Sequence, residues 1–598
     1  MISSNISAKQ DKKNILILLA AWIVWIGFFL FLISPRLNRP ITSWEIINWE
    51  TAKAISTQGP AAVQYFASPA LYPSLLALCF TIGGISELMV RITGLLCIIT
   101  MPIIIYYLAK EISDRADIFK TVLIACALFL TNPAVIQGSL IIDQADPTLL
   151  LPVLCLFYIA LFKTEKHPLW HRALVLGVAF ALCMWTKITT PLACTIALPL
   201  TFFLQKEIKK GIILSLSVFV TGGVIFLCTW FFYCQLLAGS HRFFEPFVYY
   251  AGQAKTTVFV FSSSTIGRII TDIFRVTIWF SPLFLLLAGL TIPNTLKEAD
   301  HSKPSKNALF LALFAGVVFL TYGYACATFS SFPKYFLPAL PMVCCLIAAG
   351  TSKRLNRYND KNIYILGIIS ICCGVVYYYF YVGDVIYTIH LFRQAQLIGG
   401  TKEVFSHLLR QQTLSFLFPA VLFIVSMRIV KIKLFDRIIL VLLIALISNN
   451  LSLSLTQRQA SYTTNYAYGT EGAEQLREFL RTGKVHDVYT SIEGYMANIN
   501  SVTFHNPANK IWATPDNFLA FLKQDKPSCF IYGLASNSAD ELARVMQNTN
   551  VILRLRADYQ EVVFGSYHVL LRNKDYGRLP PRATAGYINY GYILRGHR

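Results

Sequence analysis

Apolar stretches of bilayer-spanning length recur along most of this chain, from residue 14 to residue 454. Hydrophobic residues make up 55% of the sequence and charged residues only 14%, a composition typical of a polytopic membrane protein. Because a helix needs about 20 apolar residues to cross a bilayer core, the pattern predicts about 13 transmembrane helices. They are expected at 14–35, 89–109, 120–139, 147–163, 171–187, 189–205, 211–235, 272–295, 307–328, 335–352, 363–382, 412–428 and 437–454.

The positive charge of the chain follows the loops between these spans. The formal net charge is +21, and alternate loops carry roughly three or four Lys or Arg each, a bias that marks cytoplasmic loops and not a nucleic-acid site. The alternation holds only if the apolar run 70–84 does not cross the bilayer, so we interpret it as a re-entrant or membrane-surface helix. The N-terminus is then cytoplasmic, and the first span is a retained anchor and not a signal peptide.

Hydropathy falls after residue 454, and an odd number of spans places the rest of the chain on the outer side. We therefore predict two parts: a mainly α transmembrane helix bundle over 1–454, with outer juxtamembrane helices at 36–88, and a soluble α/β domain over 455–598. In the second part, helices are predicted at 472–481, 515–523 and 538–547, and strands at 485–492, 529–532, 551–555 and 561–571.

Carboxylates gather at the predicted outer face, where charge close to hydrocarbon is costly and often functional. Glu45 lies in a segment with helical spacing of apolar residues and is either a site residue or a solvated surface carboxylate. Asp143 and Asp146 lie in the short second outer loop, where a partly desolvated carboxylate suits a general base. Asp146 precedes Pro147, so helix capping is an equally simple explanation for it. Asp143 has no such local role.

Cations gather at the same predicted face. Lys187 lies in the hairpin 185–191 and could bind a phosphate or extend to the membrane interface. In the loop 236–271, Arg242 suits bidentate contact with a phosphate, and His241 suits proton transfer. Lys334 and Tyr335 open a span, where they could hold the phosphate of a lipid-linked donor or serve as interfacial anchors.

Short motifs follow one another in order along this face. They are Glu45, 68–73 (Ser-Pro-Ala-Leu-Tyr-Pro), Glu87 with Arg91, 146–149 (Asp-Pro-Thr-Leu), 185–187 (Trp-Thr-Lys) and 335–341 (Tyr-Phe-Leu-Pro-Ala-Leu-Pro). In order and sidedness they resemble the motifs of GT-C type glycosyltransferases that use polyprenyl-phosphate-linked sugars, a superfamily that includes lipid A aminoarabinose transferase and the protein O-mannosyltransferases. The resemblance covers residues 40–341, and the number of spans and the outer C-terminal domain are also similar.

The resemblance implies an inverting glycosyltransferase of the bacterial inner membrane that moves a sugar from a polyprenyl-phosphate donor to a lipid, protein or polysaccharide acceptor on the periplasmic side. Its implied catalytic carboxylates are Glu45 and either Asp143 or Asp146, and the family pattern favours Asp146. The implied phosphate ligands are Lys187, Arg242, Lys334 and Tyr335, with His241 and Arg91 as further candidates. No nucleotide site is required, because the donor is already activated. No cofactor is assigned, no metal-ligand cluster stands out, and a divalent metal is left open.

Two positions depart from the family pattern. Trp44 stands where a second carboxylate is frequent, which argues against a second carboxylate or a metal-binding role there. Ser68 stands where a basic residue is frequent, so one expected phosphate contact is either missing or supplied by Arg242 or Lys187. The alternative function is a lipid or polysaccharide transporter, which predicts charged residues at mid-bilayer depth on several spans. A membrane sensor is a third possibility, but it would not need so many helices.

Overall fold

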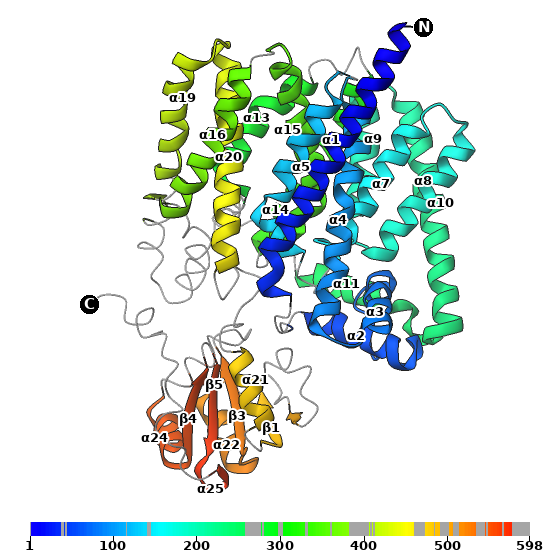
Figure 1. The fold of residues 1–598 in the computed structure, drawn as a ribbon. Coiled ribbons are helices and arrows are strands. Elements are labelled where there is room, and N and C mark those ends of the chain that lie inside the picture. The colour runs from blue at the N-terminus through cyan, green and yellow to red at the C-terminus, as the bar shows by residue number, and fades with distance from the viewer. Residues whose placement is uncertain are drawn as a thin grey trace. The chain divides into compact units, whose positions relative to one another are not determined.

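The computed structural model describes most of the chain and shows two compact units (Figure 1). The described residues are 2–37, 41, 45–114, 116–139, 145–256, 277, 280–296, 303–328, 333–358, 361–381, 406, 409–410, 413–459, 473–482, 485–490, 502–505, 514–533, 545, 548–564 and 567–576. The larger unit comprises Met1–Leu37, Asn48–Phe392 and Thr401–Gln459, and the smaller comprises Asn38–Ile47, Arg393–Gly400 and Ala460–Arg598.

The larger unit is helical throughout its described part. Its α-helices are α1 (Ile2–Ile33), α2 (Ile46–Gln58), α3 (Leu71–Gly83), α4 (Glu87–Ile112), α5 (Ile118–Leu130), α6 (Pro133–Gly138), α7 (Leu150–Lys163), α8 (Leu169–Thr186), α9 (Leu192–Leu204), α10 (Ile208–Tyr233), α11 (Glu245–Thr256), α13 (Pro282–Leu296), α14 (Lys303–Thr328), α15 (Leu340–Leu355), α16 (Lys361–Tyr381), α19 (Leu417–Ile429) and α20 (Leu434–Gln459). Short 3₁₀ turns η1 (Ser34–Arg36), η3 (Pro60–Ala62), η5 (Ser240–Phe244) and η6 (Pro333–Ala339), and the π-turn η4 (Cys234–Ala238), join some of them.

Seven of the described helices are long and apolar enough to cross a membrane. They are Glu87–Ile112, Leu169–Thr186, Ile208–Ala238, Lys303–Gly323, Lys334–Leu355, Ile363–Tyr381 and Leu434–Thr456. Seven shorter apolar helices occupy the remaining predicted spans and the run 70–84. The prediction of a polytopic, mainly α membrane protein with a small α/β part is therefore confirmed, while the number of crossings stays a prediction.

The run 70–84 forms α3, which has 13 residues. At 1.5 Å per residue it is about 20 Å long, which is shorter than the roughly 30 Å hydrocarbon core. Figure 1 shows α3 and α2 at one end of the bundle, and the ring centre of Trp49 on α2 lies 5.1 Å from that of Phe80 on α3. Helices α5 and α9, at two predicted spans, have the same length, so the interpretation of this run as a helix that does not span stays a prediction.

The run formed by η6 and α15 lies at the centre of the bundle. Within Lys334–Leu355 the most apolar stretch is 94% buried, against 28% for Ile363–Tyr381. A helix enclosed on all sides must be apolar all round, and the residues from Leu340 to Ile347 are indeed apolar and buried. The polar residues at its two ends, Lys334 and Arg354, therefore mark two opposite ends of the bundle.

Small residues let other helices approach one another closely. A Cβ at Gly222 on α10 would lie 2.9 Å from the carbonyl oxygen of Gly177 on α8. A Cβ at Gly94 on α4 would overlap the carbonyl oxygen of Ser139. Glycine at position 94 thus lets the chain segment that precedes Asp146 pack directly against α4.

The smaller unit contains a five-stranded mixed sheet with the strand order β2-β1-β3-β5-β4. Its strands are β1 (Asp487–Thr490), β2 (Thr503–His505), β3 (Cys529–Gly533), β4 (Tyr559–Phe564) and β5 (Tyr567–Arg572), and its helices are α21 (Ala473–Thr482), α22 (Pro515–Gln524), α24 (Thr549–Asp558) and α25 (Asn573–Tyr576). Strand β1 pairs in parallel with β2 and β3, and β5 pairs antiparallel with β3 and β4.

Alternating residues of this sheet pack against helices on its two faces. Cys529 and Ile531 belong to the core that includes Leu476 of α21, whereas Phe530 belongs to the core of Phe518 on α22. This follows from the period of two in a strand, which sends successive side chains to opposite faces.

Part of the predicted secondary structure in this unit is wrong. The run 551–555 was expected as a strand but forms α24, because Asn548 caps it: its side chain accepts hydrogen bonds from the backbone N–H groups of Asn550 and Val551. The run 561–571 is not one strand but the hairpin of β4 and β5. The predicted helix 538–547 lies outside the described residues, apart from Val545.

Candidate active site

Asp146 lies in the turn that leads into α7 and does not cap that helix. The turn is closed by the backbone N–H groups of Thr148 and Leu150, which donate to the carbonyl oxygen of Ala145 at 3.1 and 3.0 Å. The helix begins only at Leu150, and no side chain caps it. The capping explanation of Asp146 is therefore wrong, and its fully buried carboxylate is directed elsewhere.

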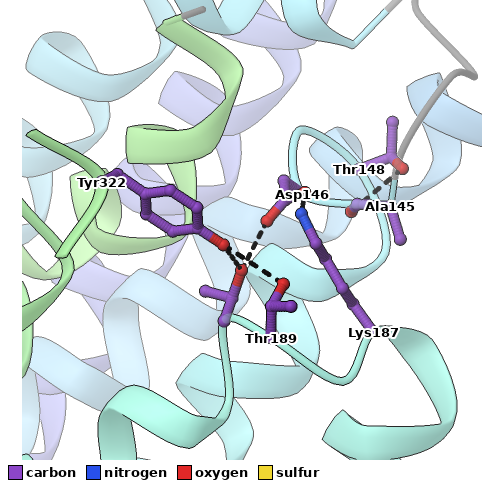
Figure 2. A network of polar contacts seen from close by, with 7 residues as sticks. Ala145, Asp146, Thr148, Lys187, Thr189 and Tyr322 are labelled. Carbon is purple, nitrogen blue, oxygen red and sulfur yellow. Dashed lines mark hydrogen bonds and ion pairs between the residues drawn. The ribbon is translucent and has the colours of Figure 1, made fainter. Parts of the chain in front are cut away.

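That carboxylate forms an ion pair with Lys187, which follows the last residue of α8. Lys187 has an extended backbone, with φ −162° and ψ 139°, which turns its side chain out of the helix and toward Asp146. Its Nζ contacts Oδ2 of Asp146, and Lys187 is only 5% exposed. Figure 2 shows the ammonium group directed at the carboxylate.

The protonated state of Lys187 depends on this pair. Burial alone would lower the pKa of Lys187, but the carboxylate of Asp146, assisted by the phenols of Tyr322, Tyr250 and Tyr335, raises it above its ordinary value. The side chain thus remains an ammonium ion at neutral pH. A buried charge of this kind is stable only while it is paired.

A second partner holds the other oxygen of the carboxylate. The hydroxyl of Thr190, in the turn between α8 and α9, donates to Oδ1 of Asp146 at 2.8 Å. The hydroxyl oxygen of Thr190 also lies 2.5 Å from the hydroxyl oxygen of Tyr322 on α14. The hydroxyl oxygen of Thr189 lies 3.4 Å from that of Tyr322. The carboxylate is therefore held from both sides.

Aromatic rings bring the two predicted phosphate lysines together. Tyr322 stacks on Tyr335 of η6 with ring centroids 5.2 Å apart and planes 9° from parallel. Nζ of Lys187 lies 5.1 Å from the centre of the Tyr335 ring, and Nζ of Lys334 lies 5.3 Å from the same centre. Such distances allow cation–π attraction. We call Asp146, Lys187, Thr190, Tyr322, Lys334 and Tyr335 the Asp146 cluster.

Arg242 and His241 are not among the contacts of this cluster. Nε of Arg242 in η5 donates to the carbonyl oxygen of Ala238 at 3.0 Å, and its Nη1 lies 3.6 Å from Glu245. Glu245 also accepts the backbone N–H of Phe66 at 2.8 Å, so Arg242 helps to fix the segment that leads to Ser68. His241 is exposed.

The remaining predicted residues have different positions. Glu45 is fully buried immediately before α2, and Arg91 is fully buried on α4. Asp143 lies outside the described residues. Within the described part of the chain, no group of three or more metal-ligating side chains comes together.

Thr190 and Tyr322 are members of the cluster that the sequence did not reveal. Thr190 belongs to the same hairpin as Lys187, so its proximity was a weak signal. Tyr322 lies inside a predicted span, and a tyrosine there is not distinguished from the other 29 among the 30 tyrosines of the chain.

Known proteins resemble this chain in part of its sequence and in most of its fold. Residues 67–233 match the family model described as dolichyl-phosphate-mannose-protein mannosyltransferase. No curated protein sequence matches the chain. The structure is similar to that of ArnT from Cupriavidus metallidurans bound to undecaprenyl phosphate, with a TM-score of 0.59 and 12% identity over 96% of this chain and 99% of that chain.

A more distant similarity is to the archaeal oligosaccharyltransferase AglB from Archaeoglobus fulgidus in complex with an inhibitory peptide and a dolichol-phosphate. Its TM-score is 0.46, with 11% identity over 94% of this chain and 75% of that chain.

The family match and the fold agree. ArnT at this level of identity shares the fold of the chain. The segment matched by the family model contains Asp146, Lys187 and Thr190 of the cluster. Part of the chain is therefore similar to that mannosyltransferase family, and most of the chain shares the fold of ArnT.

Proposed function

We propose that this protein transfers a sugar, with inversion at its anomeric carbon, from a polyprenyl-phosphate donor to an acceptor on the outer side of the membrane. The observation that carries the proposal is the Asp146 cluster, where Lys187, Lys334 and Tyr335 converge from two separate parts of the chain. A cation pair with a phenol at a helix end suits the phosphate of a membrane lipid. ArnT, which shares the fold, is bound to undecaprenyl phosphate in its structure, and this supports a polyprenyl phosphate as the carrier here.

In this proposal the donor phosphate lies against Lys187, Lys334 and the hydroxyl of Tyr335. The bond between the anomeric carbon and the phosphate oxygen breaks, and the polyprenyl phosphate leaves with the electron pair. Negative charge develops on that oxygen, and fixed ammonium groups in a site shielded from water stabilise it. An acceptor oxygen or nitrogen forms the new bond from the opposite face of the sugar, which inverts the configuration.

A carboxylate takes the proton that the acceptor loses. Asp146 already accepts one bond at each oxygen, from Lys187 and Thr190, which favours a positioning role for it. We therefore assign the base to Glu45 or Asp143.

Arg242 and Arg91 are proposed to act around the phosphate site. Arg242 is linked to Phe66 through Glu245, and this supports the proposal that Arg242 supplies the positive charge that is absent at position 68, where the chain has Ser68. His241, which is exposed, is proposed to take part only when a substrate covers it. The positions of 36–88 and 455–598 on the outer side, and of the N-terminus in the cytoplasm, belong to the same proposal, and the acceptor is a lipid, protein or polysaccharide reached from that side.

The test is sugar transfer in proteoliposomes that contain the purified protein and one of a panel of radiolabelled polyprenyl-phosphate sugars. We expect one donor to be consumed, and we expect Glu45→Gln or Asp143→Asn to abolish transfer while donor binding persists. Asp436→Asn, at the opposite end of the bundle, is the matched control. If no donor is consumed and a lipid-linked sugar instead changes leaflet, the protein is a transporter and the proposal is wrong.

A further inference from the structure

Two hydroxyl residues of the Asp146 cluster have no role in the chemistry proposed above. Thr190 is 1% exposed and donates to Oδ1 of Asp146. Tyr322 contacts Thr190 through its hydroxyl and Tyr335 through its ring. A buried polar group is costly unless it is bonded, so their arrangement is a specific one.

The direction of the hydrogen bonds among them can be deduced. An ionised carboxylate only accepts hydrogen bonds, so the single hydroxyl proton of Thr190 points to Asp146. Thr190 must then accept the proton of Tyr322, and Tyr322 in turn can accept from Thr189 at 3.4 Å. The three hydroxyls form one chain of donors that is polarised toward the carboxylate, and each bond in such a chain strengthens the next.

The ring of Tyr322 acts on a different group. It stacks almost in parallel on Tyr335, with 5.2 Å between ring centres, and Nζ of Lys187 lies 5.8 Å from the Tyr322 ring. One side chain therefore contacts the hydroxyl that holds Asp146 and the phenol that lies between Lys187 and Lys334.

We infer that Thr190 and Tyr322 are positioning residues of this active site: their hydroxyls hold Asp146 so that its second oxygen fixes Lys187, and the Tyr322 ring holds Tyr335 beside the two lysines. The inference rests on the proposed function, because it assigns to Lys187 the stabilisation of the departing phosphate. It adds that the place of this ammonium is set by two neutral hydroxyls.

The inference predicts an effect on the rate of the chemical step and not on donor binding. Without the Thr190 hydroxyl, Asp146 is held on one side only and Lys187 remains charged and present. The donor phosphate still meets a cation, so ground-state binding persists. The charge that develops on the leaving oxygen is no longer matched by a fixed ammonium, and such misplacement lowers kcat.

The experiment compares Thr190→Val with Thr190→Ser in the full-length protein, reconstituted in proteoliposomes with the donor that the wild-type protein consumes. Valine has the shape of threonine without its hydroxyl, and serine keeps the hydroxyl. We expect Thr190→Val to lower kcat about 10- to 100-fold with a nearly unchanged KM for the donor. Thr190→Ser is expected to retain most of the wild-type kcat.

Two variants of Tyr322 separate its hydroxyl from its ring. Tyr322→Phe keeps the stacking and loses the hydroxyl, so it is expected to match Thr190→Val, and the double variant should lose little more because both act in one chain. Tyr322→Leu also removes the stacking on Tyr335 and is expected to raise the KM for the donor as well.

The matched control is Tyr358→Phe. The hydroxyl of Tyr358 donates to Oδ2 of the buried Asp436 at 2.8 Å, so this change removes the same kind of bond at the other end of the bundle. Its kcat and KM should equal those of the wild-type protein, and thermal unfolding in detergent shows whether each variant is folded.

Wild-type kcat in folded Thr190→Val and Tyr322→Phe would overturn the inference and leave the proposed function intact. Equal losses in Thr190→Ser and Thr190→Val would also overturn it, because the hydroxyl would then not be the cause. If the wild-type protein consumes no polyprenyl-phosphate sugar at all, the proposed function fails and the inference fails with it.

Discussion

Two buried aspartates of the helix bundle have partners of the same kind and surroundings that differ. Asp146 contacts a lysine and a threonine hydroxyl, and Asp436 contacts Arg354 at 3.1 Å and the hydroxyl of Tyr358 at 2.8 Å. We call Asp436, Arg354 and Tyr358 the Asp436 cluster. Lys334 and Arg354, one from each cluster, lie 20 residues apart on the run of η6 and α15, so the clusters are separated by about 30 Å.

The Asp436 cluster joins the beginning of α20 to the end of α15. Arg354 and Tyr358 each donate a hydrogen bond directly to the carboxylate of Asp436. The Asp146 cluster draws side chains from the turn before α7, the hairpin after α8, α14 and η6, and it places two lysines around one stacked pair of tyrosines. The comparison teaches that a buried ion pair does not by itself indicate a reaction centre. The number of further polar groups that converge on the pair distinguishes the two.

The largest difference is expected when the cation of each pair is removed. Lys187→Met should lower sugar transfer about 10²- to 10³-fold, because one group that stabilises the developing charge is lost. Arg354→Met should leave transfer per folded molecule unchanged. The measurement is initial rates in proteoliposomes, normalised to folded protein.

Lys187→Met also leaves the carboxylate of Asp146 buried without its cation, which is itself destabilising. The double variant Lys187→Met, Asp146→Asn carries no such lone charge and separates loss of chemistry from loss of folding. Similar losses of transfer in Lys187→Met and Arg354→Met would remove the distinction between the clusters.

The pH dependence of transfer should change when Asp146 is neutralised. Asp146 raises the pKa of Lys187 above its ordinary value against the effect of burial, so in the wild-type protein Lys187 stays protonated up to at least its ordinary pKa of 10.5. In Asp146→Asn the carboxylate no longer offsets the effect of burial, so the pKa of Lys187 falls. We expect the alkaline limb of kcat/KM to move to lower pH.

The contribution of the Asp146–Lys187 pair to the free energy of unfolding should also fall as the pH rises. Because the pKa of folded Lys187 is raised, the contribution is complete below the ordinary pKa and is lost as the pH rises through the folded value. An alkaline limb in Asp146→Asn that coincides with that of the wild-type protein would mean that Lys187 does not take part.

Asp436→Asn is expected to change stability and leave the reaction unaffected. It weakens the bonds from Arg354 and Tyr358, at a cost of about 1–3 kcal/mol in the free energy of unfolding, and Tm should fall by a few degrees. Transfer per folded molecule should be unchanged. A loss of kcat in a folded Asp436→Asn protein would show that the second cluster also serves the reaction.

Glu207, immediately before α10, is a partly exposed carboxylate at the same end of the bundle as Asp436. Lys210 donates to it at 2.7 Å, and this bond, with the nearby Lys306, lowers the pKa of Glu207. The stability gained is present above the ordinary pKa and lost as the pH falls through the lowered value. Because the pair is partly exposed, Glu207→Gln should cost less than about 1 kcal/mol at pH 7.

The effect of Glu207→Gln is measured as the difference in Tm between variant and wild-type protein, at about pH 7 and about pH 4. The difference should shrink at the lower pH, because the carboxylate of the unfolded chain takes up a proton there more readily than that of the folded protein. A constant difference would show that packing, and not charge, is responsible.

Much of the bundle could be predicted from the sequence because the bilayer sets the length and apolarity of each span. The loop charges alone single out the run 70–84, which forms the helix α3, and its position relative to the membrane stays a prediction. The strand predicted at 551–555 failed because a run of Val, Ile and Leu fits a strand or a helix equally, and the cap at Asn548 decides between them.

The candidate site could be predicted for its charges and not for its neutral members. Four members of the cluster can be picked out from the sequence because charge close to hydrocarbon is costly and often functional. They are Asp146, Lys187, Lys334 and Tyr335. That Asp146 and Lys187 pair with each other depends on how the turn before α7 meets the hairpin after α8, which local sequence does not encode. Thr190 and Tyr322 carry no charge, so no sequence pattern separated them from other hydroxyls.

The most direct test of the account is a structure of the protein determined with an added polyprenyl phosphate. The account predicts the phosphate group within hydrogen-bond distance of Lys187 and Lys334, with the hydroxyl of Tyr335 as a third ligand. A phosphate bound elsewhere, with Lys187 still paired to Asp146 and in contact with nothing on the lipid, would contradict it.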